Sequence, residues 1–277
     1  MKPSRIKRRR GLRSIVASFS AAALVCIAAL AGGAPANAAQ ASSLCEFGIV
    51  VAVRGTGAPA GTGSLHDGRV YNGGGYGGLE VFRDQLLNIS PHPFRIFALN
   101  YPADGVSYFG SVTQGRNTLV TELNWLAEQC GEQLPALVVA GYSQGGAVAH
   151  NALVDVTGGP NLTAKAKFAI SAVVSIADPN YRPGQPFNAP GSTTTGQGRM
   201  GPMNNDTVAS ISSYSYWGFP TAGGPQGMVY KFRAYCSTND YWCASSNTSD
   251  AQTVHSNAGS DFGTSARLWV DYMLTSF

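Results

Sequence analysis

The segment Gly141-Tyr142-Ser143-Gln144-Gly145 contains the side chain best suited to nucleophilic chemistry. It directly follows an apolar run over 136–140 and precedes a helical pattern that extends to about Val156. In a G-x-S-x-G turn from strand to helix the serine backbone is strained, and the flanking glycines leave room for close packing. The helix N-terminus also favours negative charge that develops at the reacting centre. This context predicts that Ser143 is a nucleophile.

Four histidines compete for the role of general base. His66 and His92 precede Ser143, whereas the histidine of an α/β hydrolase follows its serine, so we expect both in loops. His150 lies seven residues after the serine in the predicted helix, about 10 Å along its axis, and is predicted to be structural. By elimination the base is His255, in a polar segment that we expect to be a loop before the last helix.

Two carboxylates compete for the role of the acid that orients the histidine. Asp178 follows the apolar run 168–177, at a carboxyl end of a strand, where α/β active sites form. Asp240 lies between Cys236 and Cys243, and a disulfide-closed loop would hold its side chain in place. Fixing the imidazole tautomer requires such a preorganised carboxylate, so Asp240 is favoured. Asp178 is then expected to begin a helix or turn.

An acyl-transfer site also needs two donors for the oxyanion of the tetrahedral intermediate. The backbone N–H of Gln144, directly after the nucleophile, is the first candidate. The second is Thr56, in the segment Arg54-Gly55-Thr56-Gly57 that leaves the first apolar run. The alternative for this segment is an ordinary glycine-rich turn.

The elements that must position these residues alternate along the chain. Continuous apolar runs predict buried strands, and apolar stripes at helical spacing predict helices. The strands are expected at 47–53, 94–101, 136–140, 168–177 and 228–235, and the helices at 79–89, 118–130, 144–156 and 266–274. This alternation predicts an α/β fold, a three-layer sandwich around a mainly parallel sheet. The glycine-rich stretches 55–63 and 73–78 and the segment 183–202 are expected to be loops.

The first residues resemble an export signal. Seven basic residues before Ile15 precede an apolar run to Ala31 and a small-residue stretch over 34–39. This order predicts a secretory signal peptide over 1–38, a single domain over 39–277 and an extracellular protein; a membrane anchor is the alternative. Without the leader, 12 basic residues face 15 acidic ones, so no nucleic-acid partner and no stable membrane insertion is expected.

The cysteines fit an exported chain. Besides Cys26 in the leader there are four, Cys45, Cys130, Cys236 and Cys243, and an even number of them indicates two disulfides. Four cysteines allow three pairings; proximity in the sequence favours Cys236–Cys243, which leaves Cys45–Cys130. The alternative is a metal site, but the chain has no C-x-x-C pair, so no metal is expected.

Taken together, these motifs resemble the cutinase family, particularly its bacterial members. The resemblance rests on Val53-Arg54-Gly55-Thr56-Gly57, the Ser143 motif, the Tyr235–Cys243 segment around Asp240, and His255, and it extends from about Cys45 to the C-terminus. It implies a lidless α/β hydrolase with a five-stranded sheet, the disulfide pairing given above, and carboxylic-ester hydrolysis without a cofactor. By position it implies that Ser143, Asp240 and His255 form a catalytic triad, with Thr56 and Gln144 as the oxyanion hole.

The resemblance leaves the ester substrate open. An open cleft suits cutin-like polyesters, lipid-like esters and other short- to medium-chain esters, whereas other members are acetyl esterases that act on acetylated plant polysaccharides such as xylan. A non-catalytic secreted binding protein is the alternative of another class. The protein is expected to be a monomer. Aromatic residues of the long segment and of the Asp240 loop either pack that segment or form a wall of the substrate groove; they are Tyr214, Tyr216, Trp217, Phe219, Tyr241 and Trp242.

Overall fold

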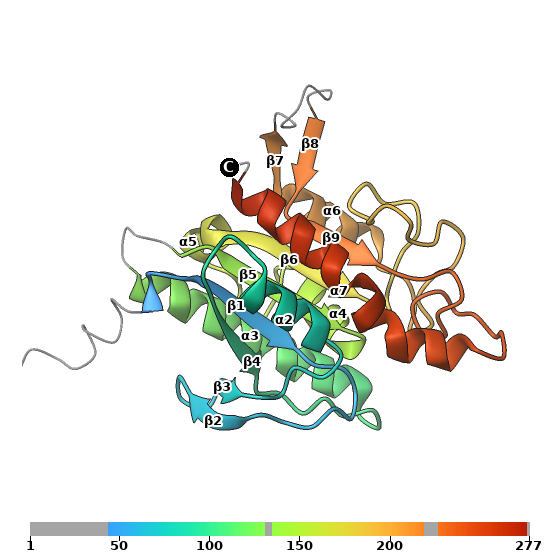
Figure 1. Ribbon diagram of the computed structural model, residues 1–277, viewed down its shortest axis with the longest axis horizontal. Helices are drawn as coiled ribbons and strands as arrows, with labels where there is room; N and C mark the ends of the chain where they lie inside the picture. The colour runs from blue at the N-terminus through green and yellow to red at the C-terminus, as the bar shows by residue number, and fades with distance from the viewer. Residues whose placement is uncertain (1–43, 131–134, 219–226, 276–277) are drawn as a thin grey trace, which may run out of the picture. The chain divides into compact units, whose positions relative to one another are not determined.

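The computed structural model describes residues 44–130, 135–218 and 227–275. The predicted signal peptide, 1–38, lies outside them. Strands and helices alternate along this part of the chain (Figure 1). In chain order they are β1 (Gly48–Val53), β2 (Thr62–Leu65), β3 (Val70–Gly73), α2 (Glu80–Asn88), β4 (Phe94–Leu99), α3 (Tyr108–Gln129), β5 (Leu137–Tyr142), α4 (Gln144–Asn151), α5 (Ala164–Ala169), β6 (Ile170–Ile176), α6 (Asn205–Ser213), β7 (Ser215–Gly218), β8 (Gly227–Tyr230), β9 (Phe232–Tyr235) and α7 (Ala251–Thr275).

Five parallel strands form the centre of the main sheet, in the order β4-β1-β5-β6-β9. This confirms the predicted α/β fold with a mainly parallel sheet. An antiparallel hairpin, β2-β3, extends the β4 edge and brings the sheet to seven strands. We expected a loop there, because glycine is depleted in strands. Strands β7 and β8 form a separate two-stranded sheet.

The sheet is covered on both faces. Helices α2 and α7 pack together on one face, and α3, α4 and α5 pack together on the other (Figure 1). Parallel strands covered in this way are apolar along their whole length, and the side chains of Ile49–Val53 and Leu137–Ala140 are accordingly at most 2% exposed. The apolar runs in the sequence therefore become the centre of the core.

Two helices begin earlier than predicted. α3 starts at Tyr108 rather than Thr118, and α7 starts at Ala251 rather than Ala266. Glycines obscured the helical pattern, although in the structure they permit close packing. A Cβ on Gly115 would lie 2.8 Å from both Tyr101 and Val148, and one on Gly259 would overlap the carbonyl oxygen of Gly78.

Two predicted strands also differ. The run 168–177 begins as the end of α5 and becomes strand β6 only from Ile170. The run 228–235 is divided at Lys231 into β8 and β9, which pair with different neighbours. A continuous apolar pattern in the sequence does not show where the chain changes partner.

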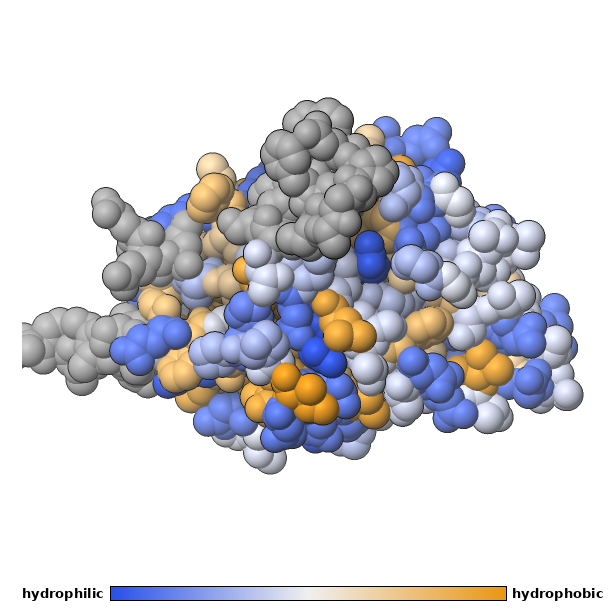
Figure 2. Space-filling model, turned by 45° about the horizontal axis from the view of Figure 1, so that its top comes forward, coloured by the Kyte–Doolittle hydropathy of each residue, from blue (hydrophilic) through white to orange (hydrophobic). Residues whose placement is uncertain are grey.

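The described surface is mixed in polarity. On the face shown in Figure 2, hydrophobic residues form separate patches between hydrophilic ones. Isolated exposed apolar side chains of this kind are common on folded proteins. Among the described residues, no helix is both long enough and apolar enough to cross a bilayer.

Candidate active site

Ser143 stands at the turn between β5 and α4. Its φ of 53° and ψ of −121° lie in a region that side-chain-bearing residues rarely occupy, as expected for a strained nucleophile turn. The flanking glycines make this turn possible: a Cβ on Gly145 would overlap the carbonyl oxygen of Val53, and one on Gly141 would overlap that of Gly145. Ser143 is largely buried, with 7% of its surface exposed.

The structure brings the three predicted triad residues together. The Nε2 atom of His255 is 2.9 Å from the Oγ atom of Ser143. On the other side of the ring, Nδ1 is 3.0 Å from both carboxylate oxygens of Asp240. A carboxylate at Nδ1 holds the proton there and leaves Nε2 free to accept the serine proton. The arrangement suits attack of Ser143 on a carbonyl carbon.

Asp240 is fixed by its own loop. It is completely buried, and its Oδ1 accepts hydrogen bonds from the backbone N–H groups of Trp242 (2.7 Å) and Cys243 (2.8 Å). The disulfide Cys236–Cys243 closes this loop directly after β9. The carboxylate can therefore orient the imidazole without moving, as the sequence argument required.

His255 lies in the second turn of α7, not in a loop as predicted. Tyr142, the residue before the nucleophile, donates a hydrogen bond to the His255 carbonyl oxygen (2.6 Å), and the two rings stack with centroids 5.6 Å apart. Burial raises the pKa of Tyr142, and the nearby charge of Asp240 raises it further, so the hydroxyl remains a donor. Tyr142 therefore helps to position His255, the candidate base, and the sequence did not predict this contact.

Gln144 is the first residue of α4, where backbone N–H groups have no partner within the helix. Its side chain is completely buried and anchors the loop after β4. Nε2 donates to the carbonyl oxygen of Asp104 (2.9 Å), and Oε1 accepts from the hydroxyl of Ser111 (3.0 Å). These contacts fix the start of the helix, so its free N–H groups lie beside Ser143.

Thr56 lies in the loop after β1, and its side chain is exposed. This loop passes close to the nucleophile, because a Cβ on the neighbouring Gly55 would be 3.4 Å from the Cβ of Ser143. Buried Arg54 fastens the loop by donating to the carbonyl oxygens of Ala58, Leu99 and Tyr101. The sequence offered a signal for this role, an arginine directly after a buried strand, but we assigned it none.

The acid and histidines that we did not choose for the triad have other partners in the structure. Asp178 forms a second buried acid–histidine pair, 2.6 Å from Nδ1 of His150, and no hydrogen bond links either residue to Ser143. Asp178 also accepts from the backbone N–H of Asn180 (2.8 Å) and so begins a turn, as expected. His66 and His92 lie in turns; Nδ1 of His66 is 2.5 Å from the buried carboxylate of Glu122.

The second disulfide is Cys45–Cys130, which ties the segment before β1 to the end of α3. Both disulfides are therefore the predicted ones, Cys236–Cys243 from proximity in the sequence and Cys45–Cys130 as the remaining pair. Among the described residues, no group of three or more histidine, cysteine or acidic side chains is arranged to hold a metal ion.

The aromatic residues that we considered for a groove wall lie in different parts of the fold. The rings of Trp242 and His255 are in edge contact at 6.5 Å, so Trp242 belongs to the site. Tyr214 is buried beside β7, and β7 pairs with β8 before the start of β9, so Tyr214 lies at the end of the sheet away from Ser143. Phe219 and the side chains of Tyr216 and Trp217 lie outside the described residues.

Comparison with known proteins identifies the family. The model of the family described as cutinase matches residues 44–274. The chain belongs to the cutinase family. This confirms the resemblance drawn from the motifs around Ser143, Asp240 and His255.

Among its relatives in the cutinase family, cutinase 11 of Verticillium dahliae is 30% identical over 224 residues, which cover 74% of this chain and 65% of that protein. An acetylxylan esterase of Hypocrea jecorina is 28% identical over 207 residues, covering 69% of this chain and 60% of that protein. The chain thus spans less than two thirds of the length of these relatives. The catalytic core domain of acetyl xylan esterase from Trichoderma reesei has a TM-score of 0.60 at 25% identity and covers 83% of this chain and 99% of that one.

Proposed function

We propose that the protein is a serine esterase that hydrolyses carboxylic esters through a Ser-His-Asp triad. The observation that carries the proposal is the continuous chain of contacts from Ser143 to His255 (2.9 Å) and from His255 to Asp240 (3.0 Å). Membership of the cutinase family supports the same chemistry. A non-catalytic binding protein would have no need of a nucleophile, base and acid in hydrogen-bonded order.

The mechanism is acyl transfer. His255 takes the proton of Ser143 as its Oγ attacks the ester carbonyl carbon, and the imidazolium that forms is stabilised by Asp240. The backbone N–H groups of Gln144 and Thr56 receive the oxyanion, and the helix dipole of α4 adds to their effect. His255 then protonates the leaving alcohol. Water, deprotonated by His255, attacks the acyl-enzyme, and the acid leaves as Ser143 regains its proton.

For the substrate we propose cutin-like polyesters or short- to medium-chain acyl esters. The second candidate is an acetyl ester of a polysaccharide such as xylan, and the similarity to acetylxylan esterase in both sequence and structure favours it specifically. An acetyl esterase needs space for one methyl group beside Ser143, whereas a polyester hydrolase must accept a longer acyl chain.

The protein is further proposed to be secreted as a monomer after removal of residues 1–38. Two disulfides in the described part of the chain fit an oxidising compartment. One chain also supplies every residue of the proposed triad.

Hydrolysis of p-nitrophenyl acetate, butyrate and palmitate by the purified protein tests the proposal, with the Ser143→Ala variant as control. We expect activity on acetate and butyrate and a fall in kcat of about 10⁶-fold in the variant, because triad members act as a unit. Activity limited to acetate would select the acetyl esterase. Equal activity of a folded Ser143→Ala variant on any of the esters would refute the proposed nucleophile.

A further inference from the structure

A cavity lies at the opposite end of the sheet from Ser143. It has a volume of about 460 Å³ and is bounded by the loop at Pro186 and Phe187, the end of β8, the start of β9 and the second half of α7. Its residues on α7 begin at Ser265, ten residues after His255 and about 15 Å farther along the helix axis. On β9 it meets Arg233, at the opposite end of the strand from Asp240. The proposed mechanism uses no part of this cavity.

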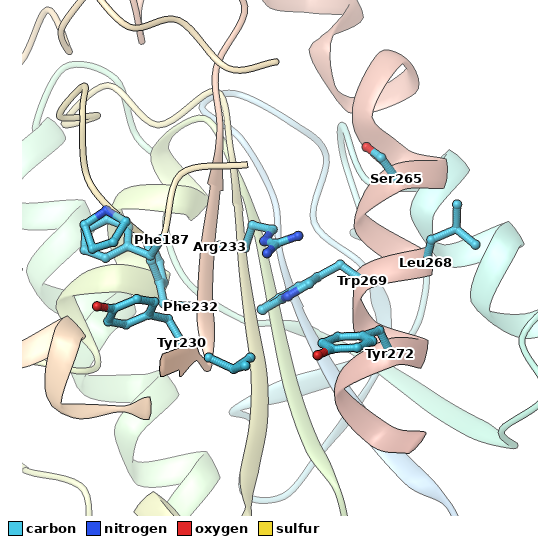
Figure 3. A pocket seen from close by; sticks show the side chains of 10 residues that line it. Phe187, Tyr230, Phe232, Arg233, Ser265, Leu268, Trp269 and Tyr272 are labelled. Atoms are coloured by element: carbon cyan, nitrogen blue, oxygen red, sulfur yellow. The ribbon is translucent and has the colours of Figure 1, made fainter. Parts of the chain in front are cut away.

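Aromatic rings line the cavity. They are Phe187, Tyr230, Phe232, Trp269 and Tyr272. Figure 3 shows Trp269 and Tyr272 extending from α7 toward the strand, and the other rings on the far side of the opening. Phe187 and Phe232 pack edge to face at 5.2 Å, so part of this wall is held rigidly. Such walls suit a flat, apolar ligand body.

The polar groups that line the cavity include an arginine but no acidic side chain. Arg233 enters between the rings, with its guanidinium carbon 5.1 Å from the ring centroid of Trp269 (Figure 3). Arg233 also has a side-chain hydrogen bond with the neutral hydroxyl of Tyr235. None of the residues that line the cavity is acidic or carries an amide side chain. A cation therefore stands in a partly desolvated aromatic setting without a counter-charge.

The indole N–H of Trp269 is a second donor that also favours an anionic ligand. Trp269 is 4% exposed, and its indole N–H is buried without an acceptor among the described residues. Burial also lowers the pKa of Arg233 below its ordinary value, because desolvation disfavours the charged form. A negatively charged acceptor beside these groups would satisfy the indole N–H of Trp269 and would stabilise the desolvated charge of Arg233, since an unsatisfied buried donor is unfavourable.

We propose that this cavity is a binding site for an aromatic monocarboxylate, whose ring lies among the aromatic side chains and whose carboxylate is bound by Arg233. Arginine matches a carboxylate with two parallel hydrogen bonds. A sugar fits less well, because its hydroxyl groups need acceptors as well as donors and the cavity offers no carboxylate or amide side chain. The site is separate from the esterase proposed above.

Isothermal titration calorimetry of the purified protein with trans-cinnamate tests the site. We expect one bound cinnamate, and affinity about 10- to 100-fold lower for the neutral cinnamamide, because charge-assisted hydrogen bonds are lost. Octanoate has an aliphatic body and cannot make aromatic ring contacts. It is therefore expected to bind several-fold more weakly than cinnamate, which corresponds to the loss of one or two such contacts. Equal affinity for cinnamate and cinnamamide, or for cinnamate and octanoate, would overturn the assignment.

Two arginine variants locate the binding. Arg233→Gln is expected to lower cinnamate affinity about 10- to 100-fold, and Arg233→Lys, which keeps the charge, by less. Arg95→Gln is the matched control, because Arg95 stacks on Phe47 at 4.7 Å and does not line this cavity; its affinity should not change. Unchanged affinity in a folded Arg233→Gln variant would place the ligand elsewhere. Hydrolysis of p-nitrophenyl acetate should be the same in all these variants, so this test is independent of the proposed esterase.

Discussion

Two buried aspartate–histidine pairs show that position decides the chemistry of a residue. In both pairs a carboxylate faces Nδ1 of an imidazole, at 3.0 Å for Asp240–His255 and 2.6 Å for Asp178–His150. The free Nε2 atom faces Ser143 in the first pair and the side chain of Asn151 in the second. The same two side-chain types therefore have different partners at the two places, and only the Asp240–His255 pair has the contacts that the proposed mechanism needs.

Replacing each aspartate by asparagine separates these roles. Asp240→Asn presents an amide to Nδ1, which moves the imidazole proton to Nε2 and removes the acceptor for the serine proton. We expect kcat to fall about 10⁴-fold with little change in KM. Asp178→Asn is the control and should keep kcat within a few-fold of the original. The kcat values of both variants are measured with p-nitrophenyl butyrate. Comparable losses of kcat in both would contradict the assignment of Asp240.

At the scale of elements, helix α7 carries His255, the proposed base, and is held by close packing on α2. The closest approach is at Gly259, where an added Cβ would overlap the carbonyl oxygen of Gly78, two residues before α2 begins. Gly259 lies one turn after His255, and Tyr142 fastens the carbonyl of His255 to the nucleophile turn. The position of the imidazole thus depends on how closely α7 approaches α2 and the turn before it.

The variant Gly259→Ala should therefore affect both stability and catalysis. Overpacking at a backbone contact costs about 1–3 kcal/mol, which lowers Tm by about 2–12 °C for a domain of this size. The displaced helix should also lower kcat. Gly110→Ala, in the exposed first turn of α3 with only the Ser107 hydroxyl close to the new Cβ, should not lower Tm. Calorimetry and kinetics on both variants measure these effects. An unchanged Tm and kcat in Gly259→Ala would show that the close contact at Gly259 does not position α7.

The two disulfides act on different properties. Cys236–Cys243 closes a short loop around Asp240, whereas Cys45–Cys130 links residues 85 positions apart. Replacing the long-range pair by serine should lower the free energy of unfolding by about 4–5 kcal/mol and leave kcat of the folded protein unchanged. Replacing the short-range pair should cost about 2–3 kcal/mol and lower kcat. Urea unfolding and kinetics measure both; a kcat loss confined to the long-range pair would contradict this division.

At the scale of the whole molecule, the proposed site forms where several chain segments leave the same edge of the sheet. Ser143 follows β5, the Asp240 loop follows β9, and the loops around Thr56 and Asp104 follow β1 and β4. Open parallel sheets bind ligands at the carboxyl ends of their strands. The aromatic cavity with Arg233 lies at the opposite end, so one sheet separates the two proposed sites.

Much of this arrangement could be predicted from local patterns. The apolar runs gave the central strands, and the Ser143 turn could be recognised because strain, flanking glycines and the following helix are all encoded within a few residues. The Asp240 loop could be chosen because its two cysteines stand close together in the sequence. Each of these signals is local.

The remainder depends on contacts between distant segments. The first half of α7 contains two glycines and several polar residues, so it forms a helix through packing on α2 rather than through intrinsic propensity. The β2-β3 hairpin is similarly secured by Arg69, whose guanidinium binds Glu122 of α3 at 2.9 Å. The role of Arg54 likewise appears only once Leu99 and Tyr101 lie beside it. Short-range patterns carry no information on such pairs.

Covalent labelling tests the central claim most directly. The protein is treated with diethyl p-nitrophenyl phosphate, and the site of phosphorylation is mapped by peptide mass spectrometry while ester hydrolysis is followed in parallel. We expect one adduct, on Ser143, that forms as activity is lost, is absent from Ser143→Ala, and forms slowly in Asp240→Asn, as the claim that Ser143 is the nucleophile requires. An adduct on another residue, or full loss of activity without modification of Ser143, would contradict it.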